Sequence, residues 1–206
     1  MYGLYSTNEV NYALVKINQE LSKDIQEGDI ILQTSESSQC EAVRLATKSK
    51  FSHCGIIFKD EDQSYVLEAV QPVKITLLTD WISHGKNSDY VIKRLKNAEQ
   101  TLNSDKINKM KDYAKSLLNK DYDLYFEWSD DKIYCSELVW KIYKEGADIE
   151  LCPFKKLKDF DLSKPQVKAI LTQRYGNQIP LNENVIAPSQ LAESNALITV
   201  TDTYKN

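Results

Sequence analysis

The stretch Ile133-Tyr134-Cys135-Ser136-Glu137-Leu138-Val139-Trp140 places a cysteine at the start of a predicted helix. From Leu138 the apolar residues recur at the spacing of one helical face, and Gly146 is expected to end the helix as its C-cap. Free N–H groups and the dipole at a helix N-terminus favour an anion, so Cys135 is expected to ionise below the ordinary thiol pKa of about 8.5. The alternative interpretation is that Cys135 is a small buried apolar residue.

A second stretch, Phe51-Ser52-His53-Cys54-Gly55-Ile56-Ile57-Phe58, begins a predicted strand with one of the chain's two histidines. Cysteine–histidine catalysis joins residues that are distant in sequence and adjacent in the fold, so His53 is a candidate base for Cys135. A purely structural histidine is the alternative. Cys54 is expected to be a packing residue. Neighbouring strand residues point to opposite faces, so His53 and Cys54 are not expected to share a metal. We expect no metal site and no cofactor.

Glu68 is the candidate third member of this group. It lies in Tyr65-Val66-Leu67-Glu68-Ala69-Val70, a predicted strand that returns after a polar turn at residues 59–63. Counting positions around this turn puts Glu68 roughly opposite His53, where a hydrogen bond would orient the imidazole. A carboxylate among apolar strand residues is costly unless it is exposed or paired. Glu68 is therefore either the partner of His53 or a solvent-facing residue of a half-exposed strand.

Length and composition indicate one globular domain. The chain has 206 residues, of which 42% are apolar and 27% are charged. A net charge of −4 gives no reason to expect a nucleic-acid partner. No run approaches the roughly 18–20 apolar residues of a membrane span, so none is expected. The N-terminus lacks the features of a signal peptide. The expected location is the cytoplasm for the chain as it stands, and outside it if a leader was removed; the oligomeric state is left open.

The order of predicted elements indicates an α+β protein. Helices are expected at about 7–21, 35–48, 104–118, 135–146 and 164–175, and strands at 30–32, 53–58, 64–70, 73–78, 90–95 and 195–200. In the helix at 35–48, Cys40, Val43 and Ala46 or Thr47 are expected to face inward. Residues 1–27 are interpreted as an N-terminal helical extension and 28–206 as a single catalytic domain. The irregular stretch at 151–188 suits a lid or one wall of a pocket.

Four segments together resemble a known family: Gly28-Asp29-Ile30-Ile31-Leu32-Gln33, Ala46-Thr47-Lys48-Ser49-Lys50-Phe51-Ser52-His53-Cys54-Gly55-Ile56, Leu67-Glu68-Ala69 and Tyr134-Cys135-Ser136-Glu137-Leu138-Val139. Their order and spacing are similar to the YiiX/YebB-like group of the NlpC/P60 superfamily. The resemblance runs from about residue 28 to 200 and includes Tyr122-Asp123 and Pro188-Ser189. It implies a circularly permuted papain-like fold, with an antiparallel sheet or small barrel packed against helices. It also implies that Cys135 is the nucleophile, His53 the base and Glu68 the orienting acid.

The expected function is that of a cysteine hydrolase of the amidase or peptidase type. We expect a short peptide or amino-acyl amide as substrate, of the kind derived from cell walls. Tyr134 or Tyr122 would supply a second contact to the oxyanion or a substrate wall, or would simply pack. Asp123 would fix its loop or bind a substrate amine. The chemical alternative is an acyl hydrolase or acyltransferase acting on a lipid ester or thioester. The alternative of another class is a non-catalytic ligand-binding module with a papain-like cleft.

Overall fold

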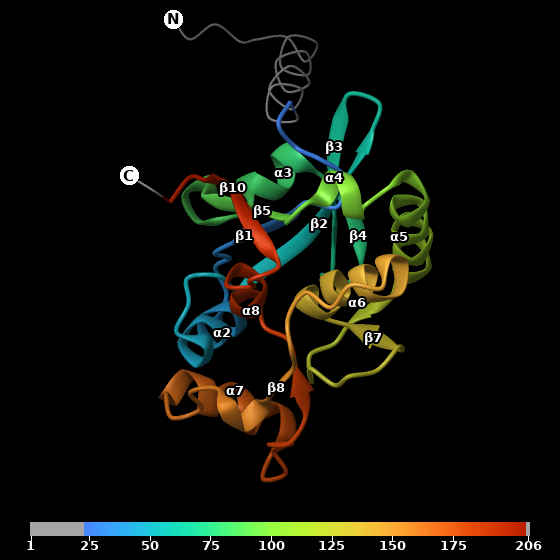
Figure 1. Ribbon diagram of the computed structural model, residues 1–206. Helices are drawn as coiled ribbons and strands as arrows, with labels where there is room; N and C mark the ends of the chain where they lie inside the picture. The colour runs from blue at the N-terminus through green and yellow to red at the C-terminus, as the bar shows by residue number, and fades with distance from the viewer. Residues whose placement is uncertain (1–22, 205–206) are drawn as a thin grey trace, which may run out of the picture.

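The computed structural model describes residues 23–204, so the helix expected at 7–21 lies outside the described residues. One six-stranded sheet forms the centre of the molecule, in the order β10-β5-β1-β2-β3-β4, and every neighbouring pair is antiparallel (Figure 1). Its strands are β1 (Ile30–Gln33), β2 (His53–Asp60), β3 (Gln63–Glu68), β4 (Lys74–Leu77), β5 (Tyr90–Leu95) and β10 (Leu197–Asp202). The open antiparallel sheet agrees with the α+β class that the sequence predicts.

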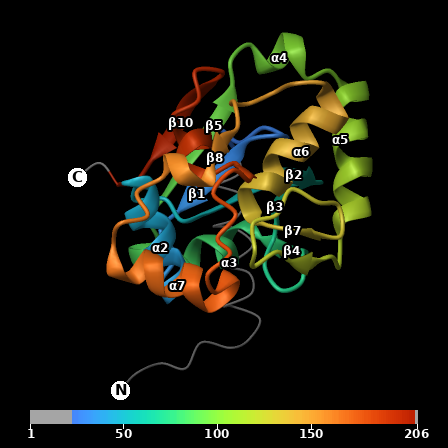
Figure 2. The same cartoon turned by 90° about the horizontal axis from the view of Figure 1, so that it is seen from below.

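Helices cover the sheet and extend beyond one end of it. They are α2 (Ser38–Thr47), α3 (Leu78–Ser83), α4 (Ala98–Thr101), α5 (Ser104–Leu117), α6 (Cys135–Ala147), α7 (Pro165–Tyr175) and α8 (Pro188–Ala192), with the 3-10 turns η1 (Lys86–Ser88) and η2 (Leu157–Asp159). Two small strand pairs complete the fold: β6 (Asp121–Tyr122) with β7 (Lys132–Ile133), and β8 (Lys155–Lys156) with β9 (Asn184–Val185). Figure 2 shows α5 and α6 together on one side, and α2 and α7 side by side on the other.

The two faces of the sheet bury alternate residues of each strand, as the period of two requires. One face packs against α5 and α6 in the main core, and it includes Ile30, Leu32, Cys54, Ile56 and Leu67. The opposite face packs against Leu78 and Trp81 of α3, and it includes Ile31, Ile57, Val66 and Ile92. Ile25 joins this second cluster, so residues just before β1 also contact the sheet.

Two expected boundaries differ from the structure. The ladder between β2 and β3 continues to the pair Asp60 and Gln63, so the turn is Glu61-Asp62 and not five residues long. Glu61 adopts φ 50°, which this tight turn requires. Helix α6 also continues through Gly146 to Ala147, and Asp148 ends it in the left-handed region with φ 55°. The expectation that Gly146 is the C-cap is therefore wrong.

Gly146 serves the packing of two helices instead. A Cβ at this position would lie 2.5 Å from the Cα of Met110 in α5. We expect Gly146→Ala to lower the free energy of unfolding by about 1–3 kcal/mol, because overpacking outweighs the preference of roughly 1 kcal/mol for alanine over glycine in a helix. Urea unfolding measures the change. The matched control is Glu145→Ala on the exposed side of α6, with an expected change within about 0.5 kcal/mol. Equal stability of Gly146→Ala and the wild type would contradict this role.

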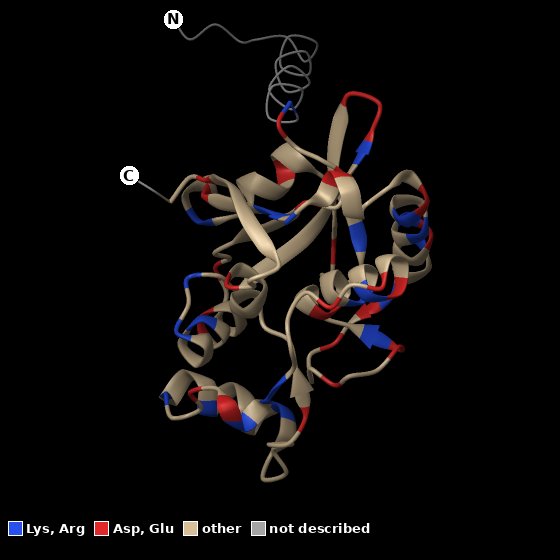
Figure 3. Ribbon diagram, in the orientation of Figure 1, with Lys and Arg blue, Asp and Glu red and all other residues tan. Residues whose placement is uncertain are grey.

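Charged side chains lie mainly on the outer helices and loops. Figure 3 shows acidic and basic positions mixed along α5, whereas the central strands are largely uncharged. Within residues 23–204, no helix has the length and apolar character needed to cross a membrane.

Candidate active site

The start of α6, the start of β2 and the end of β3 meet and bring the three predicted residues together. Cys135 is the first residue of α6, His53 the first of β2 and Glu68 the last of β3. The Nε2 atom of His53 lies 2.7 Å from Oε2 of Glu68. The ladder pairs Ile56 with Leu67, so Glu68 is beside Gly55 and diagonal to His53, and not directly opposite it. The long glutamate side chain spans this diagonal, and Gly55 has no side chain that would obstruct it.

Glu68 is held by three neighbours. Its Oε1 atom accepts a hydrogen bond of 2.6 Å from the Thr76 hydroxyl, and the Nζ atom of Lys74 lies 3.9 Å away. Burial favours the protonated carboxyl, but the hydrogen bond and charge of His53 outweigh it and lower the pKa of Glu68. The Glu68 side chain is 4% exposed, so this carboxylate is paired and not solvent-facing.

His53 connects Glu68 to Cys135. Its ring stacks on Trp81 of α3, with centroids 5.7 Å apart and an interplanar angle of 22°. Because Nε2 faces Glu68, the other ring nitrogen, Nδ1, remains for Cys135. Burial alone would lower the pKa of His53, but hydrogen bonding and charge from Cys135 and Glu68 raise it to about 10. The imidazole is therefore stabilised in its protonated form between two negative groups.

The Cys135 sulfur has a second thiol beside it, which sequence reasoning missed. Hydrogen bonding from the Cys54 side chain is the largest cause that lowers the pKa of Cys135 well below its usual value. Burial opposes this effect, and the interactions with His53 and the Cys54 backbone add to it. Cys54 was expected only to pack in the core, which it also does. On β2, the Cys54 side chain faces α6 and the His53 side chain faces α3. Cys135 lies at the end of β2, where its sulfur interacts with both of these side chains.

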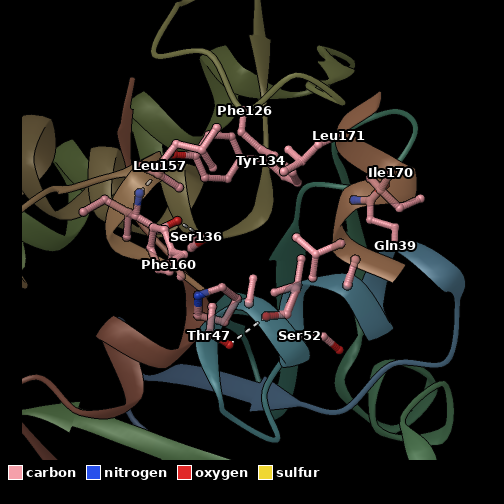
Figure 4. Close-up of a pocket in the computed structure, with 18 of the residues that line it drawn as sticks. Gln39, Thr47, Ser52, Phe126, Tyr134, Ser136, Leu157, Phe160, Ile170 and Leu171 are labelled. Atoms are coloured by element: carbon pink, nitrogen blue, oxygen red, sulfur yellow. Dashed lines mark hydrogen bonds between the residues drawn. The ribbon is translucent and has the colours of Figure 1, made fainter. Parts of the chain in front are cut away.

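A cavity with largely apolar walls opens beside Cys135 (Figure 4). Helix α2 contributes Val43, Ala46 and Thr47, which were expected to face inward. These side chains are half-buried, because they face the cavity. Ala42 is the one buried residue of α2, and Cys40 lines an adjoining pocket that reaches His53. Residues 151–188 form the opposite wall, with Leu157, Phe160, Leu162, Val167, Ile170, Leu171 and Val185 among its side chains. In Figure 4 the labelled side chains surround a common space.

The three residues predicted to contact substrate have different surroundings in the structure. Tyr122 lines the cavity, and its hydroxyl oxygen accepts a hydrogen bond of 3.0 Å from Gln39. Tyr134 also lines it, but is 1% exposed and its hydroxyl oxygen accepts from the Ile186 N–H at 3.2 Å. Asp123 is buried in its loop. Its carboxylate accepts the backbone N–H groups of Tyr125 and Glu127, at 2.7 and 2.6 Å. Of the two roles considered for Asp123, these contacts are those of a residue that fixes its loop.

Two further cavity residues escaped sequence reasoning. Gln39 of α2 donates to Tyr122, and its Oε1 atom accepts a hydrogen bond of 2.6 Å from Arg174 of α7. Neither residue belongs to a recognisable motif, and only the packing of α7 against α2 brings them together. Within residues 23–204, no group of three or more His, Cys, Asp or Glu side chains could hold a metal ion.

Comparison with known proteins places this geometry in a family. Residues 24–201 match the family described as permuted papain-like amidase enzymes, YaeF/YiiX, of the C92 family. The uncharacterized protein YiiX of Escherichia coli K12 is 46% identical over 175 residues, which cover 85% of each chain. The crystal structure of metalloprotein yiiX from Escherichia coli O157:H7 is similar, with a TM-score of 0.82 and 45% identity over 87% of this chain and 98% of that one. The chain therefore belongs to the family of permuted papain-like amidases, and the permuted papain-like fold expected from the sequence is confirmed.

Proposed function

We propose that this protein is a cysteine hydrolase that cleaves an amide bond by two-step acyl transfer. The observation that carries the proposal is the chain of side chains from Cys135 through His53 to Glu68. A thiolate is the reactive nucleophile, a neighbouring imidazolium supplies the proton for the leaving group, and a carboxylate orients the ring. Cys135 lines a cavity, which gives an acyl group room beside the sulfur.

In the first step the Cys135 thiolate attacks the amide carbonyl carbon. The candidate donors to the oxyanion are the backbone N–H of Cys135, in the first turn of α6, and the Tyr122 hydroxyl, whose oxygen accepts a hydrogen bond from Gln39. Each such donor typically contributes about 3–4 kcal/mol of transition-state stabilisation. The C–N bond then breaks as His53 gives its proton to the leaving nitrogen, and a thioester remains on Cys135.

In the second step water hydrolyses this thioester. Neutral His53 takes a proton from the water as it attacks, the C–S bond breaks, and the acid product leaves a thiolate facing an imidazolium again. Glu68, held by Thr76, keeps Nε2 occupied so that Nδ1 points to the sulfur in both steps. The similar crystal structure is described as that of a metalloprotein. Among residues 23–204 of this chain, no three His, Cys, Asp or Glu side chains are grouped so that they could hold a metal ion.

The substrate is the finer part of the proposal. A short peptide or amino-acyl amide agrees with the amidase family and with a cleft that offers hydrogen-bonding groups at Gln39 and Tyr122. The second candidate is hydrolysis or transfer of the acyl group of a lipid ester or thioester. The largely apolar walls supplied by α2 and α7 favour this candidate, since they would bury an alkyl chain.

The thiolate–imidazolium pair predicts a distinct pH dependence. We expect iodoacetamide to modify Cys135 at pH 6 at least about tenfold faster than Cys152, because the pKa of Cys135 is lowered and burial raises that of Cys152 to about 12. Hydrolysis should rise as Cys135 ionises at acid pH and fall as His53 loses its proton near pH 10. Mass spectrometry measures the alkylation of each cysteine, and a pH–rate profile measures the rise and the fall of hydrolysis.

Two comparisons separate the alternatives. In His53→Ala, modification of Cys135 should slow and shift to higher pH, because the imidazolium no longer stabilises the thiolate and only the hydrogen bonding from Cys54 remains. Equal, slow alkylation of all four cysteines in the wild type would refute the hydrolase and favour the ligand-binding module. Panels of peptide amides and fatty-acyl esters, with Cys135→Ser as the inactive control, then distinguish the two chemistries.

A further inference from the structure

Among residues 23–204, one charged side chain besides the Cys135 thiolate lines the cavity beside Cys135. Among its lining residues the others are apolar, aromatic or neutral polar, and the exception is Arg174 near the end of α7. A guanidinium remains charged in a protein, even though burial lowers the pKa of this one. A cation on an apolar wall is costly unless its N–H groups find partners.

Among the residues that the structure describes, the partners of Arg174 leave its charge without a counterion. One terminal nitrogen donates to Oε1 of Gln39 at 2.6 Å, and the guanidinium carbon lies 5.2 Å from the centre of the Phe126 ring. No carboxylate within residues 23–204 forms an ion pair with it. The charge of Asp123 acts on it from a distance, but both oxygens of that carboxylate accept N–H groups of its own loop.

The same contacts connect Arg174 to the reacting sulfur. Gln39 links Arg174 to Tyr122 through two hydrogen bonds. Burial, together with the charge of the nearby Cys135 thiolate, raises the pKa of the Tyr122 hydroxyl. Phe126, over which the guanidinium lies, packs edge-on against Tyr134 with ring centroids 5.2 Å apart, and Tyr134 directly precedes Cys135. The guanidinium thus lies on a wall of the cavity that continues to the nucleophile. A substrate whose carbonyl reaches Cys135 would extend along this wall.

We propose that Arg174 binds an anionic oxygen group, a carboxylate or a phosphate, on the acyl substrate of Cys135. The planar guanidinium has five N–H donors and matches both groups in a two-point contact. The apolar walls would hold the hydrocarbon part of the same molecule. This inference rests on the proposed function, since it assigns the substrate class of that site: an amide or ester that carries both an apolar acyl group and a negative charge.

Matched pairs of probes test the inference with the full-length protein. N-hexanoylglycine is compared with N-hexanoylglycinamide, and N-hexanoyl-O-phosphoethanolamine with N-hexanoylethanolamine. The first readout is protection of Cys135 from iodoacetamide, which needs binding but no turnover, and the second is kcat/KM where hydrolysis occurs. We expect each favoured anionic probe to exceed its neutral partner on the order of 10- to 100-fold in both readouts. Arg174→Gln should bring this ratio close to one, and Arg174→Lys should retain part of it.

The matched control is Lys168→Gln, which removes a positive charge from the exposed side of the same helix and should leave the ratio unchanged. A preference for the carboxylate or for the phosphate identifies the source of the anion, and either supports the inference. Equal protection by charged and neutral probes, no protection by any anionic probe, or an equal loss for both members of a pair in Arg174→Gln overturns it. Charge-dependent protection without turnover would refute the proposed hydrolase and support the anion site. Turnover without a preference for charged probes would support the hydrolase and refute the anion site.

Discussion

Cys135→Ala is expected to abolish hydrolysis, with a loss on the order of 10⁴-fold or more in kcat/KM. The neighbouring thiol of Cys54 is not expected to replace the nucleophile, since it is fully buried and burial, with Cys135 beside it, raises its pKa. The substitution removes one sulfur atom, so the free energy of unfolding should change by about 1 kcal/mol at most. Kinetics on the best substrate of the amide and ester panels measures the loss, and intact mass after a brief reaction should show an acyl adduct only when Cys135 is present.

Cys152→Ala is the matched control for this experiment. Cys152 is half-buried outside the cavity, and its backbone carbonyl, which accepts from the Trp140 indole, is kept in the variant. Full activity is therefore expected. Retention of a tenth or more of the wild-type rate in Cys135→Ala would show that no thioester lies on the reaction path, and the proposed mechanism would be wrong.

The parts of this site that follow local periodicity could be predicted from the sequence. The start of α6 follows from the apolar spacing after Cys135, and β2 and β3 follow from two apolar runs joined by a polar turn. The pairing of His53 with Glu68 follows from counting positions around that turn. In the strand register, Glu68 lies two residues from the position directly opposite His53. The glutamate side chain is long enough to reach the imidazole from there.

The remaining parts depend on how distant segments pack. The proximity of Cys54 to Cys135 is set by where α6 crosses the end of β2, and strand alternation alone assigns Cys54 to the core. Arg174 is 135 residues from Gln39 in the sequence, and the two side chains meet only because α7 packs against α2. The role of Gly146 was hidden for the same reason, since the backbone of Met110 is its neighbour only in the folded helix pair.

Lys141→Met is expected to lower the free energy of unfolding by about 2–3 kcal/mol at pH 7, because the polar contacts of a buried ammonium are lost, and the loss should grow as the pH rises above 8. Glu137 in the first turn of α6 is fully buried, accepts the backbone N–H of Tyr134 at 3.3 Å, and forms an ion pair of 2.9 Å with the Nζ atom of Lys141. The same Nζ atom reaches Asp130 at 2.7 Å and the Ser129 carbonyl at 2.6 Å, which ties the preceding loop to the helix. Methionine keeps the length of the side chain but leaves the buried carboxylate without a cation. Urea unfolding followed by circular dichroism measures the loss.

The pH dependence gives this prediction its sharpest test. Burial raises the pKa of Glu137 to about 8 against an ordinary value of 4.5, so the folded state binds this proton more tightly than the unfolded chain. The stability contributed by Glu137 is therefore full below about pH 4.5 and is lost as the pH rises through 8. Without Lys141 the pKa rises further, so Glu137 stays protonated in the variant at pH values where it ionises in the wild type. The cost of Lys141→Met should therefore be the same at pH 5 and pH 7 and grow by about 1.4 kcal/mol per pH unit above pH 8. Adding Glu137→Gln removes the carboxyl that would have to stay protonated, so the double variant should be more stable than Lys141→Met alone at about pH 9.5. A double variant that is less stable there, or a cost independent of pH, would show that Lys141 acts through packing over Trp128 and not through the buried carboxylate.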